Sequence, residues 1–249
     1  MMRCISKLVK RYERANDMRT ILLIVSVILL ILMICSCAAS TVVPREAFVK
    51  IISKVEATMC DEDDCEEQSL NWYGSGVIVK HTLKKSFILT AAHICNKNYI
   101  ADELLNPDEL HVRFRLHDHN GITHKGRVYK MDIGSDLCIL RTRRIHDAQP
   151  IELSGDGPYK WEKVYNLAGP MGFAGRTYVP LVEGYYSGFT SKQMIFTCPA
   201  IGGSSGSPIF NRKGELVGMI SAVHTRYPIV SMSPHYHIIK KMVLEVKDD

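Results

Sequence analysis

The feature that most constrains the fold is a succession of short apolar runs that begins near Pro44. About a dozen such runs, rich in Val, Ile, Phe and Thr, are separated by Gly, Asn, Asp or Lys at turn positions. Residues 111–117 (HVRFRLH) alternate with the period of two that is typical of a half-buried strand. Many short strands at close spacing predict an all-β sandwich or barrel.

A single segment near the C-terminus departs from this pattern. Residues 235–246 (HYHIIKKMVLEV) repeat their apolar side chains at helical spacing and predict one short helix. Residues 145–158 are poor in strand signal and form a natural joint between two lobes. The chain has 249 residues, 46% of them apolar, which is enough for one two-lobed globular domain.

The positive charge of the chain is concentrated at its N-terminus. Residues 1–19 hold six Lys or Arg and two Asp or Glu, a net of +4, whereas the chain as a whole carries +5. The remaining 230 residues are therefore nearly neutral, at +1. A nucleic-acid-binding protein needs a basic face on its folded part, so composition argues against a nucleic-acid partner.

An uncharged stretch of 25 residues, 20–44, follows this basic tail. About 20 apolar residues suffice to cross a bilayer, and basic residues before the stretch place the N-terminus in the cytoplasm. We expect a cytoplasmic tail at 1–19 and a membrane contact through 20–44. The stretch is either a retained signal-anchor or a signal peptide that is cleaved, or lipidated at Cys37, where small residues follow. Each alternative places the chain beyond about residue 45 outside the cytoplasm, on the membrane or exported from it.

The cysteines of the exported part are odd in number. They are Cys60, Cys65, Cys95, Cys138 and Cys198. At least one of them therefore has no partner within the chain. Cys60 and Cys65 flank an acidic run and can close a small hairpin loop. No C-x-x-C pair with a matching second half is present, so we expect no metal site.

Residues 200–210 (AIGGSSGSPIF) have the composition that a nucleophilic serine requires. A serine hydroxyl is a weak nucleophile unless a neighbouring base takes its proton and a third group orients that base. The reaction also needs N–H donors directed at the oxyanion that forms. If Ser205 is the nucleophile, Gly203 lets the backbone turn so that its own N–H and that of Ser205 point at one oxygen.

A base and an orienting carboxylate stand upstream in suitable contexts. Residues 88–95 (ILTAAHIC) form a strand-like run that ends at His93. Residues 134–140 (GSDLCIL) place Asp136 at the start of an apolar strand. An aspartate there can lie at the edge of a core and face an imidazole.

These three segments together resemble the signatures of chymotrypsin-fold serine proteases, and most of all the bacterial glutamyl endopeptidases and high-temperature-requirement proteases. The likeness covers roughly residues 46–245. It implies two six-stranded antiparallel Greek-key barrels, at about 45–145 and 158–249, with the short C-terminal helix after them. It also implies a serine endopeptidase that acts on polypeptides and needs no cofactor.

The resemblance also assigns roles to individual residues. Ser205 attacks the scissile carbonyl, His93 acts as base and then as acid, and Asp136 holds the histidine. The N–H groups of Gly203 and Ser205 form the oxyanion hole. The extended segment Ser221, Ala222 and Val223 pairs with the substrate main chain.

Two departures from the family pattern bear on specificity. Pro199 stands where trypsin-like members carry an Asp at the floor of the specificity pocket, so a preference for Arg or Lys is not expected. Ile220 stands where glutamyl endopeptidases carry a His, so a preference for Glu is not expected either. The alternative function is a membrane-tethered relative that binds peptides without turnover or cleaves only itself.

Overall fold

The computed structural model describes residues 18–27, 41–61, 64–104 and 107–247. The chain divides into a short unit, Met1–Thr41, and a large unit, Val42–Asp249. In the short unit residues 18–27 are helical, and most of the expected membrane segment lies outside the described residues, as do Cys37 and residues 1–17. Among the helices that are described, none is both long and apolar enough to cross a bilayer.

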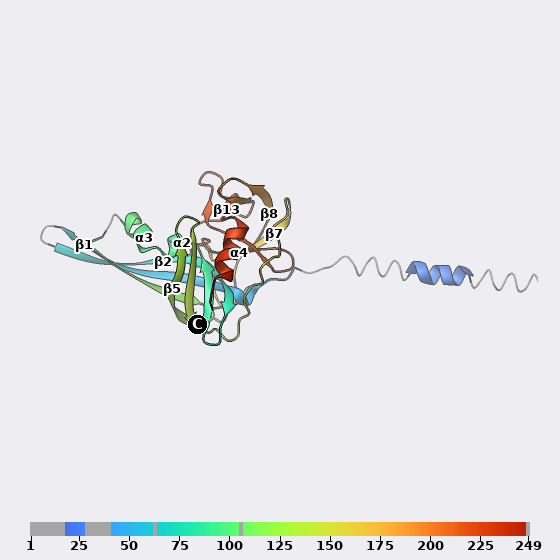
Figure 1. Cartoon of the computed structure of the whole chain (residues 1–249), viewed down its shortest axis with the longest axis horizontal. Helices are drawn as coiled ribbons and strands as arrows, with labels where there is room; N and C mark the ends of the chain where they lie inside the picture. The colour runs from blue at the N-terminus through green and yellow to red at the C-terminus, as the bar shows by residue number, and fades with distance from the viewer. Residues whose placement is uncertain (1–17, 28–40, 62–63, 105–106, 248–249) are drawn as a thin grey trace, which may run out of the picture. The chain divides into compact units, whose positions relative to one another are not determined.

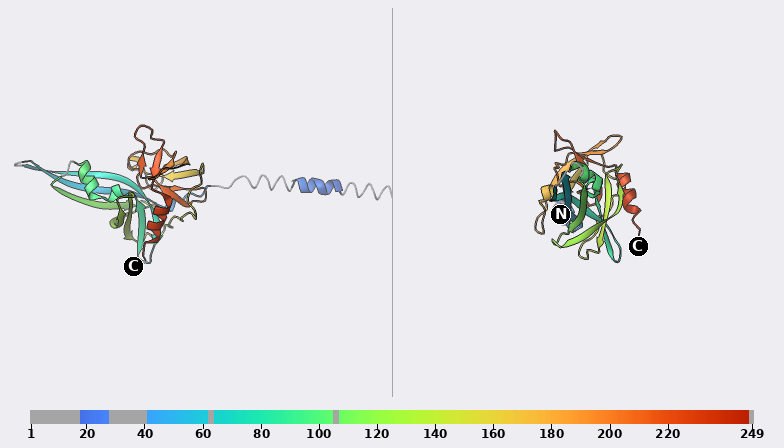
Figure 2. Two further views of the ribbon diagram at one scale, coloured as in Figure 1. Left: turned by 45° about the horizontal axis from the view of Figure 1, so that its top comes forward. Right: turned by 90° about the vertical axis from the view of Figure 1, so that its left-hand side faces the viewer.

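The first lobe is a closed antiparallel barrel, as the sequence predicted (Figure 1). Its strands pair in the order β1-β2-β3-β6-β5-β4, and they wrap around one another in the end-on view (Figure 2, right). The strands are β1 (Phe48–Asp61), β2 (Asp64–His81), β3 (Lys85–Thr90), β4 (Glu109–His117), β5 (Thr123–Asp132) and β6 (Leu137–Arg143). Two short helices, α2 (Ala92–Cys95) and α3 (Lys97–Glu103), follow β3.

The barrel interior is closely packed because aliphatic side chains alternate inward from its strands. Ile51, Ile88 and Ile139 are fully buried there. Gly76 on β2 has no room for a side chain, since an added Cβ would lie 2.7 Å from a methyl group of Ile88. The β1–β2 hairpin extends well beyond the barrel (Figure 1). The expected disulfide between Cys60 and Cys65 closes the far end of this hairpin.

The second lobe differs from the expected closed barrel of six strands. It is a seven-stranded sheet in the order β11-β10-β7-β8-β9-β13-β12, with β11 and β12 at its edges. Its strands are β7 (Lys163–Leu167), β8 (Leu181–Phe189), β9 (Met194–Phe196), β10 (Pro208–Phe210), β11 (Leu216–Met219), β12 (Ala222–Val223) and β13 (Ser231–Ser233).

The reason that the second lobe does not close is visible at the edge of β11. Leu216 donates its N–H to the carbonyl of Glu152 at 2.7 Å, and its carbonyl accepts the N–H of Ser154 at 3.1 Å. The interlobe link therefore occupies the edge that a closing strand would need. The strand β12 has only two residues and pairs with β13 on one side, and on its other side no strand of the described chain pairs with it.

The C-terminal helix α4 (Tyr236–Leu244) confirms the helical prediction. Ile239, Met242 and Val243 point from it into the main core, which also contains side chains of barrel one and of β10 and β11. The two lobes therefore share a continuous core. A short helical turn, η1 (Arg45–Ala47), precedes β1, and a second, η2 (Pro170–Gly172), follows β7.

Candidate active site

The structure brings His93 and Asp136 together at one end of the first barrel. His93 lies on α2, and Asp136 has a φ of 52° in the turn immediately before β6. The Nδ1–H of His93 donates to both carboxylate oxygens of Asp136 at 3.0 Å, and the backbone N–H of His93 donates to Oδ1 at 3.0 Å. Because the ring and the backbone bind one carboxylate, the imidazole is fixed with Nδ1 inward and Nε2 available for a proton.

Ser221 is the third member of this hydrogen-bonded group. The sequence placed it on a substrate-pairing segment, and the structure shows in addition that its hydroxyl donates to Oδ2 of Asp136 at 2.5 Å. Burial raises the pKa of Asp136, but the bonds and charge of His93 and the hydroxyl of Ser221 outweigh burial. The pKa of Asp136 therefore lies below its ordinary value, and the carboxylate form is favoured.

A disulfide between Cys95 and Cys138 holds this pair of elements together. Each cysteine stands two residues after His93 or Asp136, and both are buried, with exposed fractions of 3% and 0%. The bond joins the end of α2 to the start of β6. The sequence analysis missed this pairing, although the equal offset of each cysteine from a candidate catalytic residue is a usable signal.

The loop that carries Ser205 is held in shape by two glycines. Residues 201–204 form a tight turn in which the N–H of Ser204 donates to the carbonyl of residue 201 at 3.0 Å. Gly203 has a φ of +88° in this turn, and an added Cβ would lie 2.5 Å from the backbone nitrogen of Met171. A positive φ at the third position is typical of a type II turn and favours glycine. The loop therefore has one defined backbone conformation around Gly203.

Ser75, on β2, ties this loop to the first lobe. It is fully buried, and its N–H donates to the carbonyl of Ser205 at 2.8 Å. Its hydroxyl donates to the carbonyl of Gly203 at 2.9 Å and accepts the N–H of Gly169 at 2.9 Å. Sequence reasoning did not assign this role, and its only trace is the small-residue run of residues 74–76.

The loop of Ser205 also lies against the end of β3 and the residue after it. An added Cβ on Gly206 would lie 2.1 Å from the carbonyl oxygen of Ser75 and 3.0 Å from the backbone nitrogen of Ala91. The loop therefore lies directly against the residues that lead into α2. Within the described ranges, neither the hydroxyl of Ser205 nor the backbone N–H groups of Gly203 and Ser205 form a hydrogen bond.

The remaining residues expected to bind substrate lie on the second lobe. Ala222 and Val223 form the edge strand β12, and Pro199 is exposed in the connection between β9 and β10. The ring of Tyr99, on α3, lies 5.6 Å from the His93 ring. In the part of the chain that is described, no group of three or more His, Cys, Asp or Glu is arranged to hold a metal ion.

Comparison with known proteins agrees with this geometry. The family described as trypsin-like peptidase domain matches residues 74–219, which is more than half of the chain. The chain is 30% identical over 161 residues to a probable periplasmic serine endoprotease, DegP-like, of Marinomonas sp. (strain MWYL1). That match covers 61% of this chain and 30% of the relative, so the chain spans less than a third of the relative's length.

A solved structure shares the fold. The serine endoprotease from Yersinia pestis is similar with a TM-score of 0.59 and 16% sequence identity. The similarity covers 81% of this chain and 64% of that one. At this identity the likeness concerns the arrangement of strands.

Proposed function

Since the chain belongs to the trypsin-like peptidase family, we propose that it is a serine endopeptidase with His93, Asp136 and Ser205 as its catalytic triad. The observation that carries the proposal is the bidentate contact between His93 and Asp136 beside the rigid loop of Ser205. A histidine oriented by a hydrogen-bonded carboxylate is the arrangement that activates a serine hydroxyl.

In the proposed mechanism Ser205 Oγ attacks the scissile carbonyl while His93 Nε2 takes its proton. Asp136 stabilises the resulting imidazolium. The free N–H groups of Gly203 and Ser205 donate to the oxyanion of the tetrahedral intermediate. His93 then protonates the departing amine, which leaves an acyl-enzyme ester on Ser205. A water molecule, deprotonated by His93, hydrolyses this ester and restores the serine.

The proposed substrate is a polypeptide that adds a strand to the second lobe. β12 is an edge strand, and its side away from β13 has no strand partner among the described residues. An extended peptide can pair with Ala222 and Val223 through main-chain hydrogen bonds. Pro199 and the residues around it then contact the side chain next to the cleaved bond. The chemistry requires no cofactor.

We further propose that the enzyme acts outside the cytoplasm. Two observations support this location. The chain contains two disulfides, which persist in oxidising compartments. The Marinomonas relative is described as periplasmic. Retention through residues 20–44, as a single membrane pass, is the simplest use of the uncharged stretch.

The decisive experiment compares Ser205→Ala with Ser204→Ala in the full chain. Loss of a triad serine lowers kcat by several orders of magnitude, up to about 10⁶-fold. We expect casein hydrolysis and fluorophosphonate labelling to vanish in Ser205→Ala and to persist in Ser204→Ala, whose hydroxyl makes only one long contact, 3.4 Å, with a backbone N–H. A wild-type chain that is never labelled would be a peptide-binding relative. A labelled chain that cleaves only itself would be a self-processing one.

A further inference from the structure

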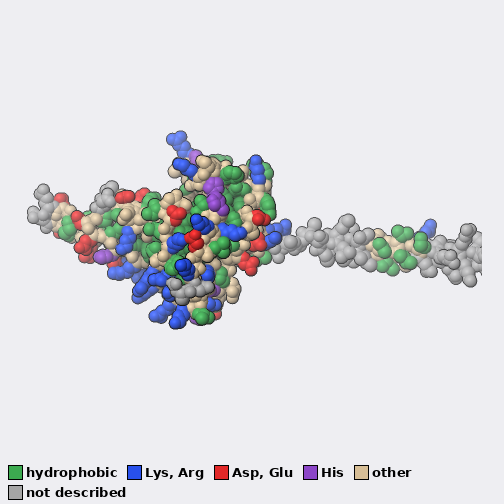
Figure 3. All heavy atoms as spheres, in the orientation of Figure 1, with side chains coloured by type: hydrophobic (Ala, Val, Ile, Leu, Met, Phe, Trp, Pro, Cys, Tyr) green, Lys and Arg blue, Asp and Glu red, His purple; other side chains and the backbone are tan. Residues whose placement is uncertain are grey.

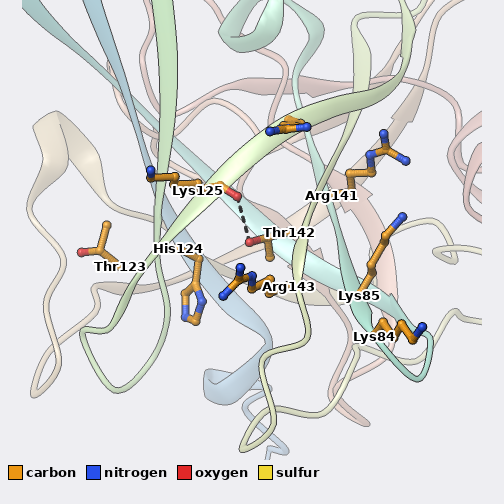
Figure 4. A pocket seen from close by; sticks show the side chains of 9 residues that line it. Lys84, Lys85, Thr123, His124, Lys125, Arg141, Thr142 and Arg143 are labelled. Atoms are coloured by element: carbon orange, nitrogen blue, oxygen red, sulfur yellow. Dashed lines mark hydrogen bonds between the residues drawn. The ribbon is translucent and has the colours of Figure 1, made fainter.

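A basic hollow lies on the first barrel, away from the proposed active site (Figure 4). Its volume is about 730 Å³, and it is formed by β5, β6, the start of β3 and the turn between β2 and β3. Six of its nine lining residues are cationic: Lys84, Lys85, Lys125, Arg127, Arg141 and Arg143. The other three are Thr123, His124 and Thr142, so none of its described lining residues carries a carboxylate. Figure 3 shows Lys and Arg gathered on this part of the surface.

In the part of the chain that the structure describes, these cations lie without an acidic partner. Over the described ranges, none of the six forms an ion pair with Asp or Glu. Other surface cations do, such as Lys130 with Glu245 and Lys163 with Glu183. The Nε2–H of His124 donates to the carboxylate of Asp118 at 2.7 Å. A concentration of unpaired like charge destabilises the folded state unless an anion binds there, although the net charge of residues 20–249 is only +1.

The hollow and the His93–Asp136 pair lie at opposite ends of the barrel. Asp136 precedes the first residue of β6, and Arg143 is its last. The seven residues of β6 span roughly 20 Å at the usual rise of an extended strand. The strand register places the start of β1 at the same end as the hollow, because Lys50 pairs with His117, which in turn pairs with Thr123. The chain therefore enters the barrel from residues 42–48 at the basic end.

Exposed aliphatic side chains accompany the cations. Leu83, at the tip of the β2–β3 hairpin, is 91% exposed and directly precedes Lys84. Ile122, the last residue of the turn between β4 and β5, is 55% exposed and directly precedes Thr123. A soluble polyanion would bind to the cations alone and would make no use of the apolar side chains. Apolar tips beside a cluster of Lys and Arg fit a membrane surface, which offers phosphate groups and an apolar layer beneath them.

We propose that this end of the first barrel docks on an anionic phospholipid membrane. The six cations bind the phosphate groups of the lipids, and Leu83 and Ile122 enter the boundary between headgroups and acyl chains. Each Lys or Arg near such a surface strengthens binding roughly fivefold. The active-site end then faces away from the membrane and stays open to polypeptide substrates. The proposal does not depend on catalysis by Ser205.

The test uses the full chain with a tryptophan at the proposed contact. Leu83→Trp and the matched control Ile133→Trp place the probe at exposed turns, since Ile133 is 64% exposed in the β5–β6 turn at the other end of the barrel. Each protein is reconstituted in vesicles of brominated phosphatidylcholine with or without phosphatidylglycerol. We expect bromine quenching of the probe at 83 only with the anionic lipid, and no added quenching at 133. Ile122→Trp provides an independent probe if the Leu83 variant is poorly folded.

Charge variants then test the cations. In the Leu83→Trp background, Lys84→Gln with Arg143→Gln should lower the ratio of docked to undocked protein roughly 25-fold. Lys192→Gln, which removes an exposed cation from the second lobe, should leave the ratio unchanged. Added salt should release the probe from the bilayer.

Several results would overturn the proposal. Equal quenching in neutral vesicles would mean that the cations do not bind headgroups, and no quenching in anionic vesicles would mean that the surface does not dock. Salt-sensitive self-association without lipid, abolished by Lys84→Gln with Arg143→Gln, would identify a second copy of the chain as the occupant. Protection of the probe by a DNA oligonucleotide, with no response to anionic lipid, would identify a nucleic acid instead.

Discussion

Removal of the Cys95–Cys138 disulfide should affect both the stability and the activity of this protein. The bond closes a loop of 43 residues. The loss of chain entropy on closing a loop of that length corresponds to about 4 kcal/mol at room temperature. We therefore expect Cys95→Ala with Cys138→Ala to lower the free energy of unfolding by about 4 kcal/mol. The variant should also hydrolyse peptides more slowly, because His93 and Asp136 each lie two residues from the lost bond.

The second disulfide of the chain provides a matched control. The bond between Cys60 and Cys65 closes only 5 residues at the end of the β1–β2 hairpin, for which the same relation gives about 2 kcal/mol. Cys60→Ala with Cys65→Ala removes the same number of sulfur atoms at a distance from the proposed site. We expect this variant to keep the wild-type kcat.

The assay pairs equilibrium unfolding in urea with kcat for a fluorogenic peptide. The free energy of unfolding measures the effect on the whole domain, and kcat measures the geometry of His93 and Asp136. The reasoning fails if the Cys95 and Cys138 variant is no less stable than the Cys60 and Cys65 variant. It fails equally if both variants lose the same fraction of kcat.

Three further predictions concern single side chains. The pKa of Asp136 is lowered in the folded state, so its contribution to stability is present above about pH 4 and is lost as the pH falls through the folded-state pKa. When the free energy of unfolding is measured against pH, Asp136→Asn should therefore lose less stability in acid than the wild type. An equal loss in the two proteins would contradict this. Burial raises the pKa of Cys198 to about 12, so iodoacetamide at pH 8 should modify it only after denaturation, as mass spectrometry can show. Ser75→Ala leaves a buried carbonyl and a buried amide unpartnered, which costs about 1–3 kcal/mol of stability for each group. The urea midpoint and kcat of this variant should both fall. Loss of stability with full kcat would mean that Ser75 does not position the proposed active site.

Local patterns in the sequence determined the strands, the C-terminal helix and the candidate catalytic residues. Period-two alternation and turn residues report on a few neighbours at a time, which is enough to predict an all-β chain. The contexts of His93 and Asp136 indicated an imidazole facing a carboxylate, and the structure brings these two side chains into contact. Cys60 and Cys65 are close enough in the chain for the sequence alone to suggest a disulfide between them.

Tertiary structure alone decided the features that depend on segments far apart in the chain. The second lobe stays open because residues 152–154 occupy the edge of β11, a competition that no local pattern reveals. Ser75 and Ser205 are 130 residues apart, yet the hydrogen bond between them holds the loop of Ser205 against β2. The six cations of the basic hollow come from three strands and one turn, and the net charge of the chain does not show where its charged residues lie in space. Sequence spacing thus identified which groups can react or bind, and the pairing of distant strands decided which of them meet.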